Sequence, residues 1–182
     1  MTTNCTVDAT FSVALALVAV QSRKTHGGTT DFDLVIDRNQ AIDQLITVEP
    51  RMVGSGHRIV FQFSGPVMSV GGASVSPVGT ATPSFSGTEV TVTLTGIADN
   101  QRVTVSLTNV NGSTPAQASL GFLVGDVNSS RSVNSSDISA VKARVGQTAN
   151  LTNFRFDVNA SGSINAVDTS AVKARAGMVL PP

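Results

Sequence analysis

The chain has 182 residues, a formal net charge of zero and only 13% charged residues. Without a basic cluster it lacks the electrostatic attraction that nucleic-acid binding requires, and no apolar run reaches the roughly 20 residues needed to span a bilayer. Tryptophan and tyrosine are absent, which disfavours the aromatic platforms on which many proteins stack sugars. Cys5 is the single cysteine, so a disulfide within the chain is impossible.

The first segment, residues 1–20, contains the apolar run FSVALALVAV. This run has the length of a signal-peptide core, but no Lys or Arg precedes it and no clean cleavage site follows. Large and small side chains alternate along it, which favours a β-strand. We therefore predict a strand that can add to a sheet edge or groove of another copy, with a leader peptide as the alternative. The large side chains are Phe11, Val13, Leu15 and Leu17.

Residues 21–124 contain short strand-like runs separated by turns rich in Gly, Asn and Asp. The clearest is TEVTVTLTG, residues 88–96, in which apolar residues alternate with threonine. Seven or eight such runs predict an Ig-like antiparallel β-sandwich. The expected strands are Phe32–Ile36, Leu45–Val48, Arg58–Phe63, Pro66–Val70, Ala73–Val78, Glu89–Leu94, Arg102–Leu107 and Ser119–Val124.

The third segment, residues 125–182, contains an internal duplication. Residues 126–146, DVNSSRSVNSSDISAVKARVG, recur at 157–177 as DVNASGSINAVDTSAVKARAG. The offset is 31 residues, and 14 of the 21 aligned positions are identical. Identity at this density indicates duplication of one structural unit rather than chance.

Each copy opens with oxygen-bearing side chains at loop positions 1, 3, 5, 7, 9 and 12. Calcium requires six to eight oxygen ligands at about 2.3–2.6 Å, and this spacing wraps them around one centre. Magnesium requires a stricter octahedron, so the pattern favours two calcium sites. The first set is Asp126, Asn128, Ser130, Ser132, Asn134 and Asp137, and the second is Asp157, Asn159, Ser161, Ser163, Asn165 and Asp168.

Both loops depart from the strongest calcium-binding pattern. Position 5 is Ser in each, and position 12 is Asp rather than the longer Glu. Position 6, where a sharp turn prefers glycine, is Gly162 in the second loop but Arg131 in the first. Two carboxylates per loop predict weak sites, toward the extracellular end of the affinity range.

A short helix is expected after each loop, because ISAVKARV and TSAVKARA are good helix formers. Gly146 and Gly177 are placed to terminate these helices. The apolar residues at position 8, Val133 and Ile164, are expected to point into the core and pair the two loops. Neither loop is preceded by a clear helix, so each copy lacks the entering helix of a full EF-hand.

A duplicated calcium loop with an exiting helix resembles the dockerin family. The resemblance rests on GDVNSSRSVNSSD and FDVNASGSIN, and it covers roughly residues 125–182. It implies a calcium-dependent extracellular module that binds a cohesin-like partner. It also implies recognition by loop positions 10 and 11 and by a basic residue of the following helix. In the first copy these are Ser135, Ser136 and Lys142, and in the second Ala166, Val167 and Lys173.

Other polar residues offer no catalytic arrangement. His26 and His57 lack metal-ligand neighbours in the sequence and are expected at the surface or in turns. Nothing pairs Glu49 with Glu89 as acid and base, so a non-enzymatic protein is predicted. The sequons with the best prospect of carrying glycan begin at Asn4, Asn111 and Asn150.

Two functions are consistent with this sequence, which is typical of a secreted or cell-surface bacterial protein. The first is a calcium-stabilised structural subunit that assembles with other copies into fibres through its N-terminal strand. The second is an adaptor in which the dockerin-like segment binds a cohesin-like protein and the Ig-like segment is a spacer. The position of residues 8–20 separates them, because a strand folded into its own sandwich is unavailable to a neighbour.

Overall fold

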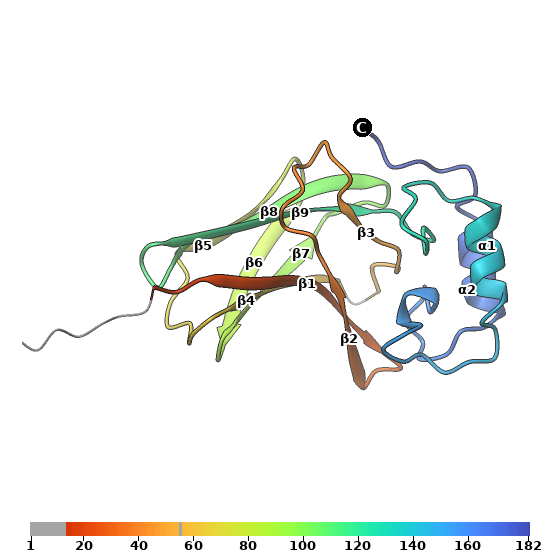
Figure 1. Ribbon diagram of the computed structural model, residues 1–182, viewed down its shortest axis with the longest axis horizontal. Helices are drawn as coiled ribbons and strands as arrows, with labels where there is room; N and C mark the ends of the chain where they lie inside the picture. Colours follow the sequence, from red (N-terminus) through yellow and green to blue (C-terminus); the bar gives the residue numbers. More distant parts are fainter. Residues whose placement is uncertain (1–13, 55) are drawn as a thin grey trace, which may run out of the picture.

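The structure, a computed structural model, describes residues 14–54 and 56–182. Two β-sheets pack face to face, and a small helical part lies against one end of them (Figure 1). The chain is therefore mainly β, as predicted. No helix among the described residues is long and apolar enough to cross a membrane.

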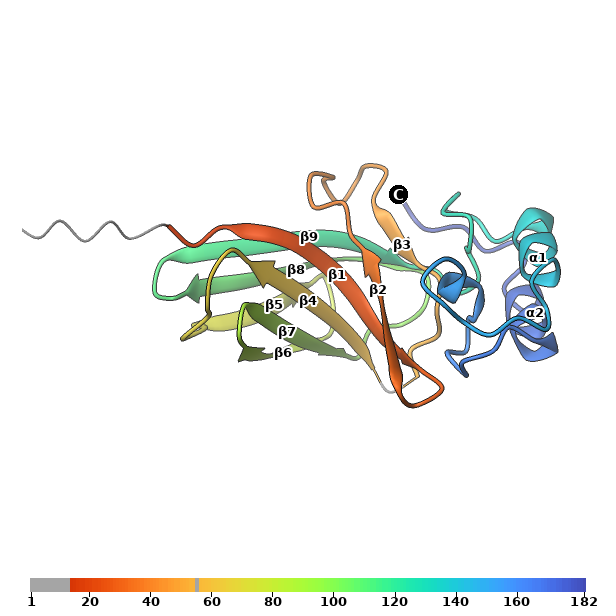
Figure 2. The ribbon, with the colours of Figure 1, turned by 60° about the horizontal axis from the view of Figure 1, so that its bottom comes forward.

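The first sheet contains five strands in the order β2-β1-β4-β7-β6, and every neighbouring pair is antiparallel. The long strand β1 crosses the molecule and ends against the helical part (Figure 2). The five strands are β1 (Leu17–His26), β2 (Thr30–Val35), β4 (His57–Phe63), β6 (Thr80–Ser86) and β7 (Glu89–Thr95).

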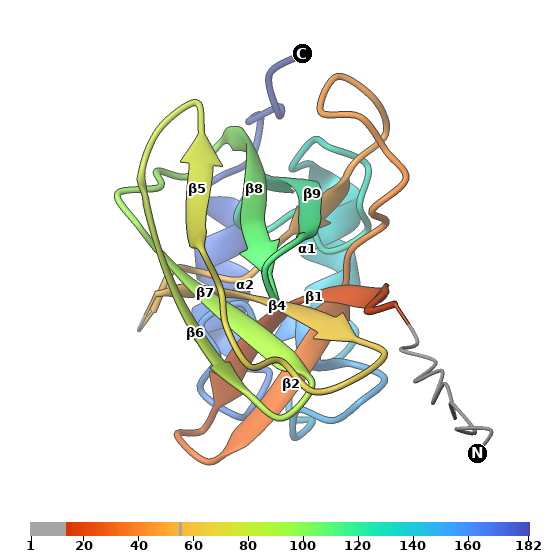
Figure 3. The ribbon, with the colours of Figure 1, turned by 90° about the vertical axis from the view of Figure 1, so that its left-hand side faces the viewer.

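The second sheet contains four strands in the order β3-β9-β8-β5. Viewed from the end, the two sheets form separate layers (Figure 3). The short strand β3 runs parallel to β9, which is the exception to the antiparallel pairing that the sequence predicted. These strands are β3 (Thr47–Glu49), β5 (Gly72–Ser76), β8 (Gln101–Val110) and β9 (Thr114–Phe122).

The sandwich core forms because alternate residues of each strand point inward. In β7, Val90, Val92 and Leu94 are buried while the threonines between them are more exposed. They join Phe61 and Phe122 in one apolar cluster between the sheets. Burial stabilises such a layer by about 25 cal/mol per Å² of apolar surface.

The strands differ from the sequence prediction in β1, which continues past the predicted residue 20 to His26, at residues 66–70 and in β6. Residues 66–70, predicted as a strand, lie outside any strand. Strand β6 was not predicted, since its sequence, TATPSFS, is polar and contains Pro83. Proline is tolerated there because β6 is at the edge of its sheet, where a missing N–H need not break a ladder.

The N-terminal segment is folded into its own sandwich as far as the structure describes it. Residues 17–20 belong to β1 and pair with β4, and the Ser64 amide donates to the Ala16 carbonyl at 2.8 Å. Leu15 and Leu17 pack against the sandwich core. The expectation that these two leucines bind another copy is therefore corrected, while Phe11 and Val13 lie outside the described residues.

The C-terminal part contains α1 (Ser135–Lys142), the short 3-10 helix η1 (Phe154–Phe156) and α2 (Ala166–Lys173). Each of the two α-helices follows an oxygen-rich loop, as predicted. Strand β9 precedes the first loop and η1 precedes the second, so no α-helix enters either loop.

The two copies interlock through their ends. Val133 of the first loop exchanges backbone hydrogen bonds with Gly177 and Met178, both at 2.8 Å. Ile164 of the second loop does the same with Gly146 and Gln147, at 2.8 and 2.9 Å. Position 8 is buried in both loops, as expected, but each loop pairs with the segment after the other copy's helix rather than with the other loop.

Sandwich and repeat share a second apolar core. Ile46 and Val48, from the sandwich, cluster with Val133, Ile164 and other residues of the repeat. Both sandwich residues are buried, with exposed fractions of 3% and 0%. Separating the two parts would expose these side chains to water, so they pack as one body.

Candidate functional site

The first oxygen-rich loop brings together the carboxylates at its two ends. Asp126 accepts hydrogen bonds from the amides of Ser130 and Arg131, at 2.9 and 2.8 Å. Asp137 accepts from the amides of Asn128 and Asn134, at 3.2 and 3.0 Å. Both carboxylates are fully buried, so the loop backbone holds positions 1 and 12 on its inner side.

The second loop repeats these contacts with nearly equal distances. Asp157 accepts from the amides of Ser161 and Gly162, at 2.9 and 2.7 Å. Asp168 accepts from Asn159 and Asn165, at 3.1 and 2.9 Å. The spacing seen in the sequence therefore produces two loops of the same geometry.

Tight turning of each loop requires left-handed backbone at positions 4 and 6. The φ angles are 62° at Ser129 and 66° at Arg131, against 56° at Ala160 and 91° at Gly162. Glycine adopts such angles without a Cβ penalty, whereas other residues pay about 1–2 kcal/mol. The first loop therefore keeps its shape at an energetic cost that the second avoids at position 6.

Electrostatics inside the loops favour a bound cation. Burial, together with the charge of Asp137, raises the pKa of Asp126 above its usual range. Burial and the charge of Asp157 raise the pKa of Asp168 likewise. Two buried carboxylates facing one another are costly unless a positive charge neutralises them, and the other loop oxygens come from Asn, Ser and backbone carbonyls. This all-oxygen set fits calcium.

The described residues contain no group of three His, Cys, Asp or Glu side chains arranged for a metal ion. That finding is consistent with the loops, because each has only two carboxylates and draws its remaining oxygens from neutral groups. Such a donor set suits a hard cation and lacks the nitrogen and sulfur ligands that zinc prefers.

The residues expected to recognise a partner lie on the surface of the repeat. Ser135, Lys142 and Lys173 are exposed. Ser136 is exposed as well, and its hydroxyl donates to Asn134 at 2.8 Å and accepts from Asn128 at 2.7 Å. The predicted recognition residues are therefore accessible, with Ser136 tied to the first loop.

Both histidines correct the expectation of a surface role. His26 and His57 are 2% and 4% exposed. The His26 Nδ1 atom lies 2.7 Å from the Asp157 carboxylate, so a sandwich residue reaches position 1 of the second loop. His57 packs against Phe122, with ring centroids 4.0 Å apart.

A buried ion pair lies behind His26. Arg51 and Glu49 are both completely buried, and two guanidinium nitrogens donate to the carboxylate at 2.7 Å each. Burial alone would raise the pKa of Glu49, but the charge of Arg51 and hydrogen bonds from Arg51 and Ser22 lower it to about 2. Glu49, for which the sequence suggested no partner, is thus an ionised part of the contact between sandwich and repeat.

One sequence signal of this cluster exists in β1. Its inward-facing residues are Val20, Ser22, Lys24 and His26, so the buried face changes from apolar to polar along the strand. A polar inward face marks the place where the sandwich core ends and another part of the chain packs. The long sequence separation between His26 and Asp157 hides the partner itself.

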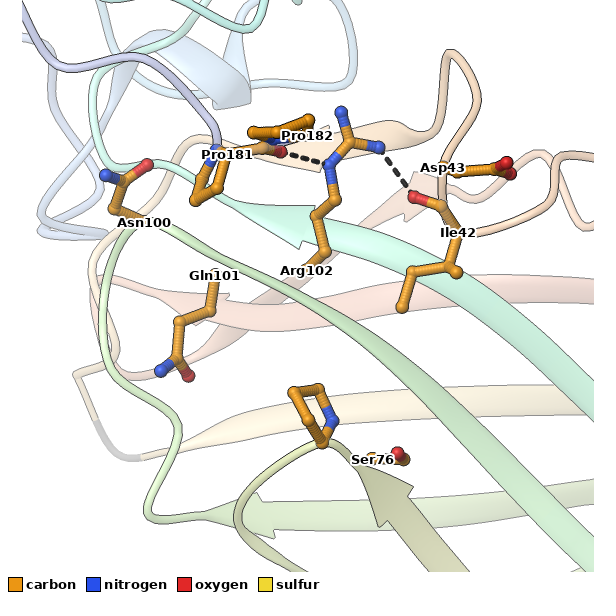
Figure 4. Close-up of a pocket in the computed structure, with 9 residues that line it drawn as sticks. Ile42, Asp43, Ser76, Asn100, Gln101, Arg102, Pro181 and Pro182 are labelled. Carbon is orange, nitrogen blue, oxygen red and sulfur yellow. Dashed lines mark hydrogen bonds between the residues drawn. The ribbon is translucent and has the colours of Figure 1, made fainter.

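A hollow of about 500 Å³ lies beside the C-terminal tail (Figure 4). Arg102 crosses it and donates to the carbonyls of Pro181 and Ile42. Because its guanidinium is held by backbone carbonyls from two segments, this hollow is where the tail is fastened to the sandwich.

The candidate glycosylation sites differ in accessibility. The Asn111 amide nitrogen donates to the Pro66 carbonyl at 2.9 Å, and its oxygen accepts from the Met68 amide at 2.7 Å, so the side chain is engaged. Asn150 is exposed in the loop between the two copies. Asn4 lies outside the described residues.

Comparison with family models matches residues 124–175 to the dockerin type I domain. Comparisons with curated proteins and with solved structures found no match. The matched residues contain both oxygen-rich loops and both α-helices. Dockerin domains of this type bind calcium and act in protein–protein interaction, and they occur in extracellular or cell-surface assemblies. The C-terminal part of the chain is therefore a dockerin-like calcium-binding repeat, preceded by an Ig-like β-sandwich.

Proposed function

We propose that the chain is a non-catalytic, calcium-dependent adaptor that binds a cohesin-like partner through its C-terminal repeat. The dockerin type I match carries this proposal. The exposed helices at the end of the sandwich support it, because they leave a surface free for a partner (Figure 1). The proposal places the chain outside the cell or on its surface.

Calcium has a structural role in this proposal, with one ion in each loop. The candidate ligands are the oxygens at positions 1, 3, 5, 7, 9 and 12, with position 7 contributing its backbone carbonyl. Neutral ligands at four of these positions favour the weak affinity of extracellular modules, about 10⁻⁴–10⁻³ M.

Recognition is proposed to depend more on the first copy than on the second. Ser135 and Ser136 present hydroxyl groups at positions 10 and 11, next to the exposed Lys142. The second copy has Ala166 and Val167 at the same positions, and Val167 is 59% exposed. A partner that hydrogen-bonds the hydroxyl pair would leave its polar groups unpaired against the second copy.

The sandwich is proposed to be a rigid support for the repeat. Ile46 and the β3 residue Val48 belong to the core beneath the loops, so the repeat cannot rotate freely against the sandwich. A flexible linker would leave such residues exposed.

The adaptor proposal is tested by measuring binding of the full chain to a panel of purified cohesin modules, by calorimetry in calcium and in excess chelator. Binding is expected in calcium and is expected to be lost in chelator. Lys142→Glu is expected to weaken it about tenfold or more, as for a central charged contact. The matched change in the second copy, Lys173→Glu, is expected to have a smaller effect.

Failure of every cohesin module to bind the calcium-loaded chain would contradict the adaptor proposal. Equal loss from the two lysine variants would contradict only the assignment of recognition to the first copy. Circular dichroism of both variants in calcium is the control for folding.

Assembly into fibres through residues 1–20 has less support. Residues 17–20 already pair within their own sheet, and Leu15 packs on the same core. Light scattering of the full chain beside one lacking residues 1–13 tests what remains of this idea. Large assemblies lost on truncation would restore it.

A further inference from the structure

We propose that His26 of the sandwich is a positioning residue for calcium at the second loop. Through it, the second loop and the sandwich act as one cooperative unit, while the first loop lacks this support. The inference rests on the calcium binding proposed above and concerns a residue far from both loops in sequence.

The Asp157 carboxylate has two hydrogen bonds that its counterpart Asp126 lacks, a long one from the Ser161 hydroxyl at 3.4 Å and a short one from His26. Asp157 accepts from two loop amides, as Asp126 does, and also from His26 at 2.7 Å. Among residues 14–54 and 56–182, His26 is the single Lys, Arg or His side chain that hydrogen-bonds a carboxylate at position 1 or 12 of either loop. The His26 and Asp157 side chains are about fully buried, at 1% and 0% exposed.

The neighbours of His26 determine which nitrogen carries the proton. The Arg51 Nη1 atom lies 3.2 Å from His26 Nε2. A guanidinium can only donate, so Nε2 accepts and the proton sits on Nδ1, which donates to Asp157. Glu49 fixes Arg51 from the other side, at 2.7 Å. The imidazole is therefore held in one orientation by a chain of buried groups.

Backbone contacts hold the hairpin between β1 and β2 against the same loop. The Gly27 amide donates to the Ala160 carbonyl at 3.0 Å. A Cβ on Gly162 would lie 3.1 Å from the Gly27 Cα, so the two glycines allow a close approach of the two backbones. The Met52 amide donates to the Val158 carbonyl at 2.8 Å. The second loop therefore contacts the sandwich through the backbone of Val158, Ala160 and Gly162.

Aromatic packing completes the contact. The rings of Phe32 and Phe154 stack with centroids 5.5 Å apart, and His26 meets the Phe32 ring edge-on at 5.0 Å. The Arg51 guanidinium lies 5.1 Å from the Phe154 centroid. Phe154 belongs to η1, immediately before Asp157, so this packing places the start of the loop.

Groups that hydrogen-bond a metal ligand fix its orientation, and their removal typically lowers metal affinity 10- to 100-fold. His26 has this relation to Asp157. The coupling is reciprocal. If contact with the sandwich raises the calcium affinity of the second loop, then bound calcium stabilises that contact by the same free energy.

The test uses the full chain as wild type, His26→Leu and His26→Asn. Calcium is titrated while ¹H–¹⁵N spectra follow the Arg131 and Gly162 amides, which report the two loops separately because each donates to the position 1 carboxylate of its own loop. His26→Leu is expected to weaken the second loop about tenfold or more and the first less than threefold. His26→Asn, which keeps an N–H near the Nδ1 position, is expected to recover part of the loss.

A second measurement needs no variant. Hydrogen exchange of wild-type amides in residues 22–30 is expected to slow on calcium addition. Equal weakening of both loops by His26→Leu, or unchanged exchange at residues 22–30, would overturn the inference while leaving calcium binding in place. A wild-type chain that binds no calcium at either loop would overturn the proposed calcium function and this inference together.

Discussion

Arg131 occupies a backbone conformation that its side chain disfavours, since its φ angle is 66°. Replacing it with glycine is expected to raise the free energy of unfolding by about 1 kcal/mol, because a Cβ penalty of about 1–2 kcal/mol is removed and part is offset by the greater freedom of glycine when unfolded. Chemical denaturation in calcium measures this change.

The same position in the second loop provides the opposite control. Gly162→Ala is expected to destabilise the chain by more than 1 kcal/mol, because φ is 91° and the new methyl group would press on the backbone of Gly27. Equal stability of wild type and Arg131→Gly would show that the first loop relaxes its turn by another route.

His57 predicts a loss of stability in acid. Burial, helped by the charge of Lys24, lowers its pKa from 6.5 to about 3. Below about pH 6.5 His57 becomes protonated in the unfolded chain but stays neutral in the folded chain. The free energy of unfolding therefore falls as the pH falls toward 3. The slope from this residue is at most about 1.4 kcal/mol per pH unit.

His57→Leu is the matched variant, measured by denaturation from pH 7 to pH 4 at one calcium concentration. In the wild type, the buried Nδ1 atom of His57 has no hydrogen-bond partner. Replacing His57 with an apolar residue is therefore expected to change the free energy of unfolding little at neutral pH. The free energy of unfolding of the variant is expected to fall less steeply with decreasing pH than that of wild type. An equal pH dependence in the two proteins would show that His57 does not cause the loss of stability in acid.

At this scale the loop residues were predictable and the residues beneath them were not. The loop side chains follow one another at fixed spacing, so the sequence alone predicts that they lie around one centre. Arg51, Glu49 and His26 meet through the fold, and nothing in the local sequence of a buried ion pair distinguishes it from a solvated one. Their burial is a property of the packed molecule.

At the scale of elements, the C-terminal tail packs against strand β9 of the sandwich. Leu180 is 4% exposed and packs against Gly121 of β9, where a Cβ would lie 2.5 Å from the leucine side chain. Leu180→Ala is expected to lower the free energy of unfolding by about 2–4 kcal/mol, as for other buried leucines. Thermal or chemical denaturation measures it.

Gly121→Ala tests the same contact from the other side. It is expected to destabilise wild type but to be tolerated in the Leu180→Ala background, which gives a measurable coupling between the two changes. Additive effects would show that the tail does not rest on β9.

The elements that the sequence predicted best are those with a clear period. Strand β7 alternates apolar and threonine residues, and both α-helices consist of good helix formers that follow an oxygen-rich loop. Strand β6 and the polar half of β1 were missed, because an edge strand with proline and an inward face of Ser, Lys and His break the alternation on which prediction depends. Tertiary packing supplies what the local pattern lacks.

At the scale of the molecule, the shared core predicts that calcium stabilises the sandwich and the repeat together. In calcium at 100 times the dissociation constants, two sites would add about 5 kcal/mol to the free energy of unfolding. Chelation is therefore expected to lower the midpoint temperature by on the order of 10 °C, with a single transition in calcium. Differential scanning calorimetry follows both quantities.

Magnesium at the same concentration is the control, and a much smaller shift is expected from it. A sandwich transition whose temperature is the same in calcium and in chelator would contradict the coupling. It would show that the second core contributes little to holding the two parts together.

The course of β1 has a mechanical consequence. The strand runs from the end of the sandwich opposite the helices to the end where the helices pack (Figure 2). Tension between residue 14 and a partner held on the helices would load β1 along its own axis, across its hydrogen bonds to β2 and β4. Many of those hydrogen bonds would have to break at the same time. The sandwich would therefore transmit force to the bound partner before the sandwich itself unfolded.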